Sequence, residues 1–343
     1  MSATASSPSL APPACSDAVL WDVFLSAFQV PALVLADDLG LYAALADGPA
    51  TPDALATRLD VEPRAIAAIA GTLTALGLLH ALDGRYHLGE VARTYLVPSS
   101  PYYWGGMLRR IRDNPLDCRR LAAALRAGRA AADARVTGLW DVPEPPVEAL
   151  VAFTHAMHAH SFALAMRVAP ALGLAGHVLD VGGGSGSYAI AAAHRLPGVR
   201  ATIFDLPAVC AVAAQYAREH GVAERVATHA GNMFRDAWPT GHDRVFMSDI
   251  LHDWDDARCA WLVGRARAAL APGGRVVLHE LVTADGGDGP LVAVEYSMAM
   301  LFSTHGRQRS ARELAALCTD AGLVDVTVTP TANGYAAISG AAP

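Results

Sequence analysis

The stretch Val178-Leu-Asp-Val-Gly-Gly-Gly-Ser-Gly186 decides the fold of this 343-residue chain. Its first four residues have the character of a buried strand, glycines fill four of the next five positions, and an Ala-rich helical segment, 188–196, follows. Glycine permits a sharp turn and lets a ligand lie against the backbone. The stretch therefore predicts a strand, a tight ligand-facing turn and a helix. No Lys-Ser or Lys-Thr follows the glycines, which argues against a nucleoside triphosphate.

A second acidic residue sharpens this prediction. Asp205 ends the next expected strand, 199–205, at the distance of about 20 residues or slightly more at which a βαβ unit presents a carboxylate to a ribose. Asp180 ends the first strand in the same way. The glycines do not form a clean G-x-G-x-x-G pattern, so the residues alone leave NAD, FAD and S-adenosylmethionine open as ligands.

Composition narrows the class of protein. Apolar residues make up 53% of the chain and charged residues 17%, which indicates a globular protein with a sizeable core. The net charge of −7 opposes nucleic acid as the main partner. Five scattered cysteines without a Cys-x-x-Cys pair are typical of a reduced, cytoplasmic protein. Residues 1–17 are expected to form a flexible tail without a secretion signal, and we expect no membrane span.

Residues 18–100 have the pattern of a winged helix. Apolar residues recur at helical spacing from 18 to 46 with a break expected at Pro31, and Thr51 and Pro52 begin a further helix. A helix over 64–79 and a hairpin over 84–89 complete the module. Because it carries few basic residues, we expect it to pack against a partner subunit in a homodimer and not to bind DNA.

Residues 101–172 are expected to form helices broken by prolines at 115, 143, 145 and 146. Within them Phe153, Met157 and His160 share one helical face, whereas His155 and His158 point elsewhere. A stripe of this kind is compatible with plain core packing and with the wall of a substrate pocket.

Residues 173–343 alternate strand and helix and predict an α/β fold, a mostly parallel sheet with a terminal antiparallel hairpin. The expected strands are 178–181, 200–204, 226–229, 244–248, 274–280, 324–329 and 335–338, with Asn333-Gly334 as the last turn. Ligands of such sheets bind at the carboxyl ends of the strands. Asp180, Asp205, Asp249, Glu280 and the turn 231–233 all occupy such ends.

Six motifs follow one another in order: Leu179-Asp-Val-Gly-Gly-Gly-Ser-Gly186, Phe204-Asp-Leu-Pro207, Gly231-Asn-Met-Phe234, Leu251-His-Asp-Trp-Asp-Asp256, Leu270-Ala-Pro-Gly-Gly274 and Gly306-Arg-Gln-Arg-Ser310. Together they resemble the S-adenosylmethionine-dependent small-molecule O-methyltransferases of the caffeic acid and acetylserotonin type. The resemblance extends from about residue 20 to the end of the chain. It implies a Rossmann-like catalytic domain preceded by a winged-helix dimerisation domain.

The resemblance also assigns cofactor contacts. Gly182 and Gly184 would lie along the methionine part of S-adenosylmethionine, and Asp205 would accept both ribose hydroxyls. The other residues implied at the cofactor are Asp180, Leu206, Asn232, Met233, Phe234 and Ser248. Two of these depart from the family pattern, because Asn232 stands where an Asp is usual and Ser248 where a Lys is frequent.

For the reaction, the resemblance implies that His252 removes a proton from a substrate hydroxyl. In the family two acids orient this histidine. Glu280 matches the first, but Gln308 stands at the second, and an amide cannot stabilise an imidazolium as a carboxylate would. The pocket face of Phe153, Met157 and His160 would contact the substrate.

Three alternatives remain open from the sequence. Some relatives methylate a carbon beside a 2-oxo acid, and His252 and Asp253, with Glu280 or His305, could hold a divalent metal for that reaction. Methylation of nitrogen is the second alternative. The third is a non-catalytic winged-helix regulator that binds the cofactor. The identity of the substrate does not follow from the sequence.

Overall fold

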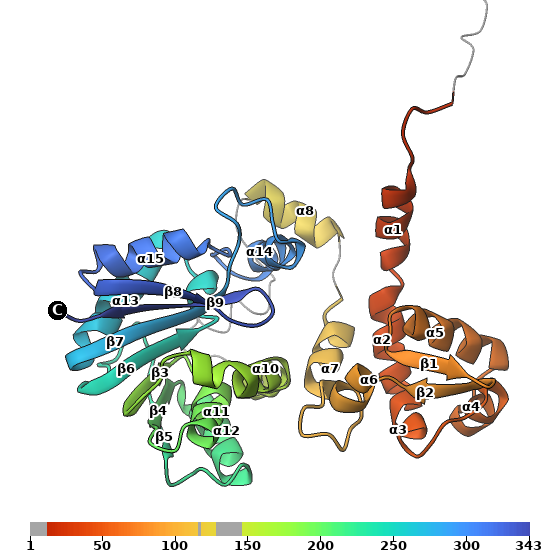
Figure 1. Ribbon diagram of the computed structural model, residues 1–343, viewed down its shortest axis with the longest axis horizontal. Helices are drawn as coiled ribbons and strands as arrows, with labels where there is room; N and C mark the ends of the chain where they lie inside the picture. Colours follow the sequence, from red (N-terminus) through yellow and green to blue (C-terminus); the bar gives the residue numbers. More distant parts are fainter. Residues whose placement is uncertain (1–11, 116–117, 128–145) are drawn as a thin grey trace, which may run out of the picture. The chain divides into compact units, whose positions relative to one another are not determined.

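The computed structural model describes residues 12–115, 118–127 and 146–343 (Figure 1). The chain divides into two compact units, residues 1–101 and 102–343. Of the expected features, residues 1–11 of the tail and the prolines at 143 and 145 lie outside the described residues.

The first unit is built from short helices and one hairpin. Its elements are α1 (Ala18–Ser26), α2 (Gln29–Asp38), α3 (Leu41–Ala46), α4 (Pro52–Leu59), α5 (Pro63–Ala75), β1 (Leu79–Leu82), β2 (Arg85–Leu88) and α6 (Glu90–Tyr95). The Thr51 side chain accepts a hydrogen bond from the backbone N–H of Ala54 and so begins α4 as predicted. The order of helices and hairpin confirms the predicted N-terminal winged-helix module.

Two local predictions for this unit are wrong. The helical break falls at Ala27 and Phe28 and not at Pro31, because Pro31 is the third residue of α2, where its missing N–H has no partner to lose. The helix expected over 64–79 ends at Ala75, since Gly77 adopts a left-handed φ of 74° and Leu79 already pairs in the hairpin.

The N-terminal helices of this unit expose a large apolar surface. Seven side chains leave more than half of their area exposed: Val19, Leu20, Trp21, Val23, Phe24, Leu25 and Phe28. The helical stretch Ala18–Asp38 has a mean hydropathy of 1.8 and is long and apolar enough to cross a membrane by length and composition alone. This stretch does not by itself show a membrane span, which the sequence does not lead us to expect. A helix that packs against a partner subunit would have the same composition.

The second unit contains a seven-stranded sheet in the order β5-β4-β3-β6-β7-β9-β8. The strands are β3 (His177–Val181), β4 (Arg200–Asp205), β5 (Val226–Ala230), β6 (His242–Ser248), β7 (Leu270–Leu281), β8 (Val324–Pro330) and β9 (Tyr335–Ala341). Strands β3 to β7 pair in parallel, whereas β9 runs antiparallel to both β7 and β8. The predicted mostly parallel sheet with its terminal hairpin is confirmed.

Helices cover both faces of this sheet (Figure 1). The helices of the second unit are α7 (Gly105–Asp113), α8 (Cys118–Ala127), α10 (Val147–Val168), α11 (Ser187–Arg195), α12 (Pro207–Glu219), α13 (Asp256–Ala268), α14 (Leu291–Ser303) and α15 (Ala311–Asp320), of which α7 packs on α10 and α8 on α14. One apolar cluster joins α10, α11 and α12 to the strands, and a second joins α13 and α15 to the opposite face. The central strands β3 and β6 are thus largely buried, which explains their apolar sequence, whereas the edge strands β5 and β8 stay mostly exposed.

Candidate active site

A cavity of about 350 Å³ lies at the carboxyl ends of β3, β4 and β6, a volume in the range of small-molecule sites. Helices α7, α10 and α14 supply its other walls. It brings together thirteen of the residues predicted for the site: Phe153, Met157, His160, Asp180, Gly182, Gly184, Asp205, Leu206, Asn232, Met233, Phe234, Ser248 and His252. Glu280 and Gln308 do not line the cavity but are buried beside His252.

The glycine turn is shaped for a ligand in two different ways. Gly182 has a φ of 65°, and a Cβ there would stand 2.5 Å from Cδ1 of Ile250. Gly184 has a φ of 57°, but a Cβ there would meet no atom within 4 Å. Gly182 is therefore required by packing, whereas Gly184 leaves open space in the wall of the cavity. A ligand can lie against the backbone at that point.

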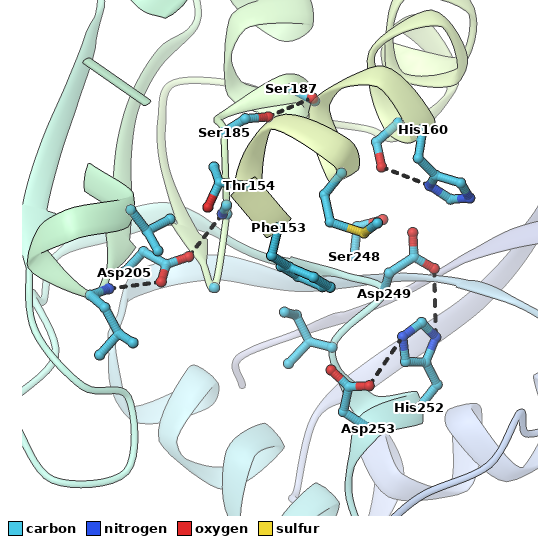
Figure 2. Close-up of a pocket in the computed structure, with 18 of the residues that line it drawn as sticks. Phe153, Thr154, His160, Ser185, Ser187, Asp205, Ser248, Asp249, His252 and Asp253 are labelled. Atoms are coloured by element: carbon cyan, nitrogen blue, oxygen red, sulfur yellow. Dashed lines mark hydrogen bonds and ion pairs between the residues drawn. The ribbon is translucent and has the colours of Figure 1, made fainter. Parts of the chain in front are cut away.

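Asp205 is held rigidly at the end of β4. Its Oδ2 accepts a hydrogen bond of 2.8 Å from the N–H of Gly184, and its Oδ1 accepts one of 2.7 Å from the N–H of Leu206 (Figure 2). Each carboxylate oxygen keeps a second lone pair, which suits a diol. Burial raises the pKa of Asp205 to about 6, although the two backbone hydrogen bonds oppose the shift.

Asp180 offers an acceptor that no described residue uses. Burial, and then repulsion from Asp205, raise its pKa to about 7, and its Oδ2 is buried without a hydrogen-bond partner among the described residues. An unpaired buried acceptor favours a ligand that brings a donor or a positive charge. S-adenosylmethionine carries both, so Asp180, Asp205 and the glycine turn fit this cofactor.

Asn232 and Ser248, the two residues that depart from the family pattern, both use their side chains in hydrogen bonds within the protein. The Asn232 side-chain oxygen accepts from the N–H of Phe234 at 2.9 Å and so holds the turn after β5. The Ser248 hydroxyl lies 3.0 Å from Nδ1 of His279, a buried histidine behind the pocket. Both residues line the cavity while their side chains serve these internal contacts.

His252 is the buried centre of a cluster of polar groups. Its Nδ1 lies 3.3 Å from Oε2 of Glu280 and 3.1 Å from the side-chain nitrogen of Gln308. Glu280 also accepts the backbone N–H groups of Ile250 and Leu251 at 3.0 and 2.9 Å, so one carboxylate positions both the loop and the ring. The residues predicted from the resemblance therefore do meet at the imidazole.

Asp249 is a member of this cluster that the sequence reasoning placed at a strand end but did not assign to the site. Its Oδ1 lies 3.7 Å from Nδ1 of His252, while Oδ1 of Asp253 lies 3.6 Å from Nε2. Figure 2 shows the imidazole between these two carboxylates. Asp249 adopts a left-handed φ of 54°, and this backbone conformation turns the chain directly after β6. The sequence offered one indication that Asp249 belongs to the site, namely an acidic residue directly after an apolar strand.

The charges in this cluster set the protonation of the ring. Burial alone would lower the pKa of His252, but Glu280, Asp253 and Asp249 together outweigh it and raise the pKa to about 10. Burial in turn raises the pKa of Asp249 to about 7 and that of Asp253 to about 6, against the attraction of the imidazolium. The ring therefore has a high proton affinity.

The opposite wall is formed by α10 and its neighbours. Phe153, Met157 and His160 share one face, as the helical spacing predicts, and the structure shows that this face lines the cavity. His158 turns away and contacts the Ser185 hydroxyl at 3.0 Å. The structure adds Arg110 of α7 and Tyr296 of α14, which sequence reasoning did not single out. The ring of Tyr296 lies 5.5 Å from that of His252. Nothing in the sequence near Arg110 or Tyr296 indicates that they reach this cavity.

The metal ligands considered from the sequence were His252 and Asp253 with Glu280 or His305. The structure brings together a different group of possible ligands. Among the described residues, ligand atoms of Asp249, His252 and Glu280 lie within 4.8 Å of one another. His305 is exposed and lies outside the cavity, and its backbone N–H donates to the carbonyl of Asp253.

Comparison with known proteins gives two family models that match this chain. Residues 119–324 match the model of the O-methyltransferase domain, and residues 21–98 match that of the O-methyltransferase dimerisation domain. The chain belongs to the O-methyltransferase family. This methyltransferase depends on S-adenosylmethionine, as the sequence motifs predict.

Two curated relatives and one solved structure illustrate the similarity. The 3-hydroxy-5-methyl-1-naphthoate 3-O-methyltransferase of Streptomyces sahachiroi is 34% identical over 93% of this chain and 94% of its own length. The N,N-dimethyltransferase OxyT of Streptomyces rimosus is 33% identical over 74% of this chain and 75% of its own. The human N-acetylserotonin methyltransferase in complex with SAM superposes with a TM-score of 0.82 at 25% identity, covering 97% of this chain and 99% of that one.

Proposed function

We propose that the enzyme transfers the methyl group of S-adenosylmethionine to a hydroxyl of a small aromatic molecule, with His252 as the general base. The observation that carries this proposal is the buried imidazole at the cavity wall, with its Nδ1 3.3 Å from the Glu280 carboxylate. In the tautomer whose Nδ1–H donates to Glu280, Nε2 is the nitrogen that accepts the proton, and Gln308 lies beside the same edge of the ring. Methylation of a hydroxyl is also the reaction in the name of the Streptomyces sahachiroi relative.

Proton transfer to His252 is well matched to a phenol. The neighbouring carboxylates raise the pKa of the ring from its usual value toward that of a phenolic hydroxyl, about 10, which makes transfer of the phenolic proton to the neutral ring less unfavourable. The cofactor supplies an electrophilic methyl group on a sulfonium. The acceptor oxygen gains that methyl group, its proton goes to Nε2, and the neighbouring carboxylates stabilise the resulting imidazolium.

Asp249 has a specific part in this proposal. Gln308 stands where a second acid is usual, and its amide cannot balance the positive charge of the ring. Asp249 places a carboxylate 3.7 Å from the same nitrogen. We infer that it replaces the missing acid from a different strand end.

The cofactor half of the cavity is proposed to hold S-adenosylmethionine in the following way. Asp205 would accept the ribose hydroxyls, because its two oxygens are already oriented by Gly184 and Leu206. Asp180 and the turn 182–184 would face the methionine part. The segment 232–234 and Leu206 would flank the adenine. Phe153, Met157 and His160 would contact the acceptor.

The test is turnover of labelled S-adenosylmethionine with panels of phenols, amines and 2-oxo acids, each with and without chelator. We expect phenols to be methylated, chelator to have no effect, and His252→Ala to reduce turnover by about 100- to 10,000-fold. His194→Ala, at an exposed histidine, is the matched control. Loss of activity with chelator, together with 2-oxo acids as acceptors, would replace this proposal by metal-assisted carbon methylation. Preferred methylation of amines would move the reaction to nitrogen, as in the name of OxyT.

We further propose that the enzyme is a homodimer formed through its first unit and that it works in the cytoplasm. Residues 21–98 match a dimerisation domain and carry the exposed apolar helices, which a partner subunit would cover. All five cysteines are free thiols, in keeping with a reducing compartment. The net charge of −7 argues against nucleic acid as a partner, and the apolar stretch 18–38 is assigned to the subunit interface and not to a membrane.

A further inference from the structure

The acceptor side of the cavity contains a cation without a carboxylate partner among the described residues. Arg110 of α7 lines the cavity, and its guanidinium carbon lies 5.1 Å from the centre of the Phe153 ring. Its guanidinium forms no ion pair or hydrogen bond with any of the described residues. Burial lowers the pKa of Arg110, and the principal opposing influence is Tyr296, not a carboxylate.

Arg110 is half-buried, and the fully buried Arg309 shows how this protein treats such a charge when it is structural. Arg309 donates to the carbonyl oxygens of Leu251 and Trp254 at 2.8 and 3.0 Å and pairs with Asp256 at 2.6 Å. A buried guanidinium without such acceptors is costly unless a ligand supplies them. Arg110 is therefore suited to a ligand and not to a role in the core.

The position of Arg110 connects it with the reacting end of the cavity. It shares the cavity with Tyr296, whose ring lies 5.5 Å from the imidazole of His252. The surroundings of that imidazole are acidic, because Asp249, Asp253 and Glu280 all lie within 3.7 Å of it. These carboxylates repel an anionic acceptor, so an acceptor with a negative charge needs a cation elsewhere in the cavity.

We propose that the acceptor is an aromatic hydroxy acid whose carboxylate is bound by Arg110 while its hydroxyl faces His252. This inference rests on the hydroxyl methylation proposed above and defines its substrate class. The planar guanidinium offers paired N–H donors that match the two oxygens of a carboxylate. The contact with the face of Phe153 uses none of the N–H donors of the guanidinium.

The experiment compares three acceptors of one ring system: a hydroxynaphthoate, its methyl ester and the corresponding naphthol. In the wild-type enzyme we expect kcat/KM for the acid to exceed that for the ester by about 10- to 100-fold, the range of one charge-assisted interaction, chiefly through KM. Arg110→Met should bring the ratio of acid to ester close to one, and Arg110→Lys should keep part of the preference. Arg109→Met, on the exposed side of the same helix, should leave the ratio unchanged.

Calorimetry of S-adenosylmethionine binding shows whether each variant is folded. If the wild-type enzyme uses acid and ester equally well, and Arg110→Met does not change the ratio, Arg110 serves only to pack on Phe153 and this inference is wrong while hydroxyl methylation stands. If none of the three acceptors is methylated but amines or 2-oxo acids are, the proposed function itself fails.

Discussion

Replacement of Asp249 by Asn removes one charge beside the imidazole with little change in shape. Asn tolerates the left-handed φ of 54° at this position, and its amide oxygen can still accept the 3.4 Å hydrogen bond from the Tyr335 hydroxyl. Asp249 is one of the carboxylates that raise the pKa of His252. The variant should therefore have a lower pKa at His252 than the wild-type enzyme.

The size of the effect follows from the separation of the two charges. At the 3.7 Å between Oδ1 of Asp249 and Nδ1 of His252, Coulomb's law gives about 1 kcal/mol in a water-like medium and about 4.5 kcal/mol at an effective dielectric constant of about 20. At 1.36 kcal/mol per pKa unit these limits are about 0.8 and 3.3 units. Asp249 is ionised above its own pKa of about 7, and His252 loses its proton near 10. The negative charge of Asp249 is therefore present throughout the pH range in which His252 titrates.

The assay is kcat/KM against pH with one phenolic acceptor, supported by NMR titration of labelled histidine in which the His252 signal is assigned by its loss in His252→Ala. A base must be unprotonated, so activity rises as pH rises through the pKa of the ring. In Asp249→Asn this rise should occur about one to three pH units lower. The maximum rate should be smaller, because an amide stabilises the imidazolium less well than a carboxylate.

Asp320→Asn, at an exposed acid that ends α15 and does not line the cavity, is the control and should not shift the profile. An unchanged pKa at His252 in Asp249→Asn would show that the Asp249 carboxylate does not act on the ring. A shift to higher pH would contradict the sign of the electrostatic argument. Either result would remove Asp249 from the mechanism and leave Glu280 as the principal charge partner.

Three further predictions test other parts of the molecule. Asp205→Ala should weaken S-adenosylmethionine binding by about 1.5 to 3 kcal/mol in calorimetry, with a smaller loss in Asp205→Asn, and an unchanged affinity would reject the placement of the ribose. Gly306→Ala should destabilise the protein by about 1 to 3 kcal/mol in urea and lower activity, because its Cβ would overlap the backbone carbonyl of His252, whereas Gly264→Ala in α13, where a Cβ meets no atom, should be neutral or stabilising. Trp21→Glu with Phe24→Glu should convert a dimer into a monomer in analytical ultracentrifugation, since both side chains are exposed within their own unit, and a wild-type mass that is already monomeric would refute the homodimer.

The sequence was sufficient wherever a property depends on local pattern. The glycine turn after Val181, the acid at the end of β4 and the Thr51 cap follow from backbone sterics and from hydrogen bonds between near neighbours, and the structure has each of them at the expected place. The face shared by Phe153, Met157 and His160 follows from helical geometry in the same way. The six ordered motifs were then sufficient to predict the family and S-adenosylmethionine as its methyl donor.

Tertiary structure decided what depends on contacts between distant segments. Whether the imidazole of His252 has one carboxylate or three as neighbours depends on how β7, which carries Glu280, meets the segment after β6. Asp249 enters this cluster through a left-handed backbone turn that no residue pattern reveals. Arg110 reaches the same cavity from a helix more than a hundred residues earlier in the chain. Because electrostatic energies vary with separation and burial, the protonation of the base and the charge of the acceptor were not readable until these segments were placed together.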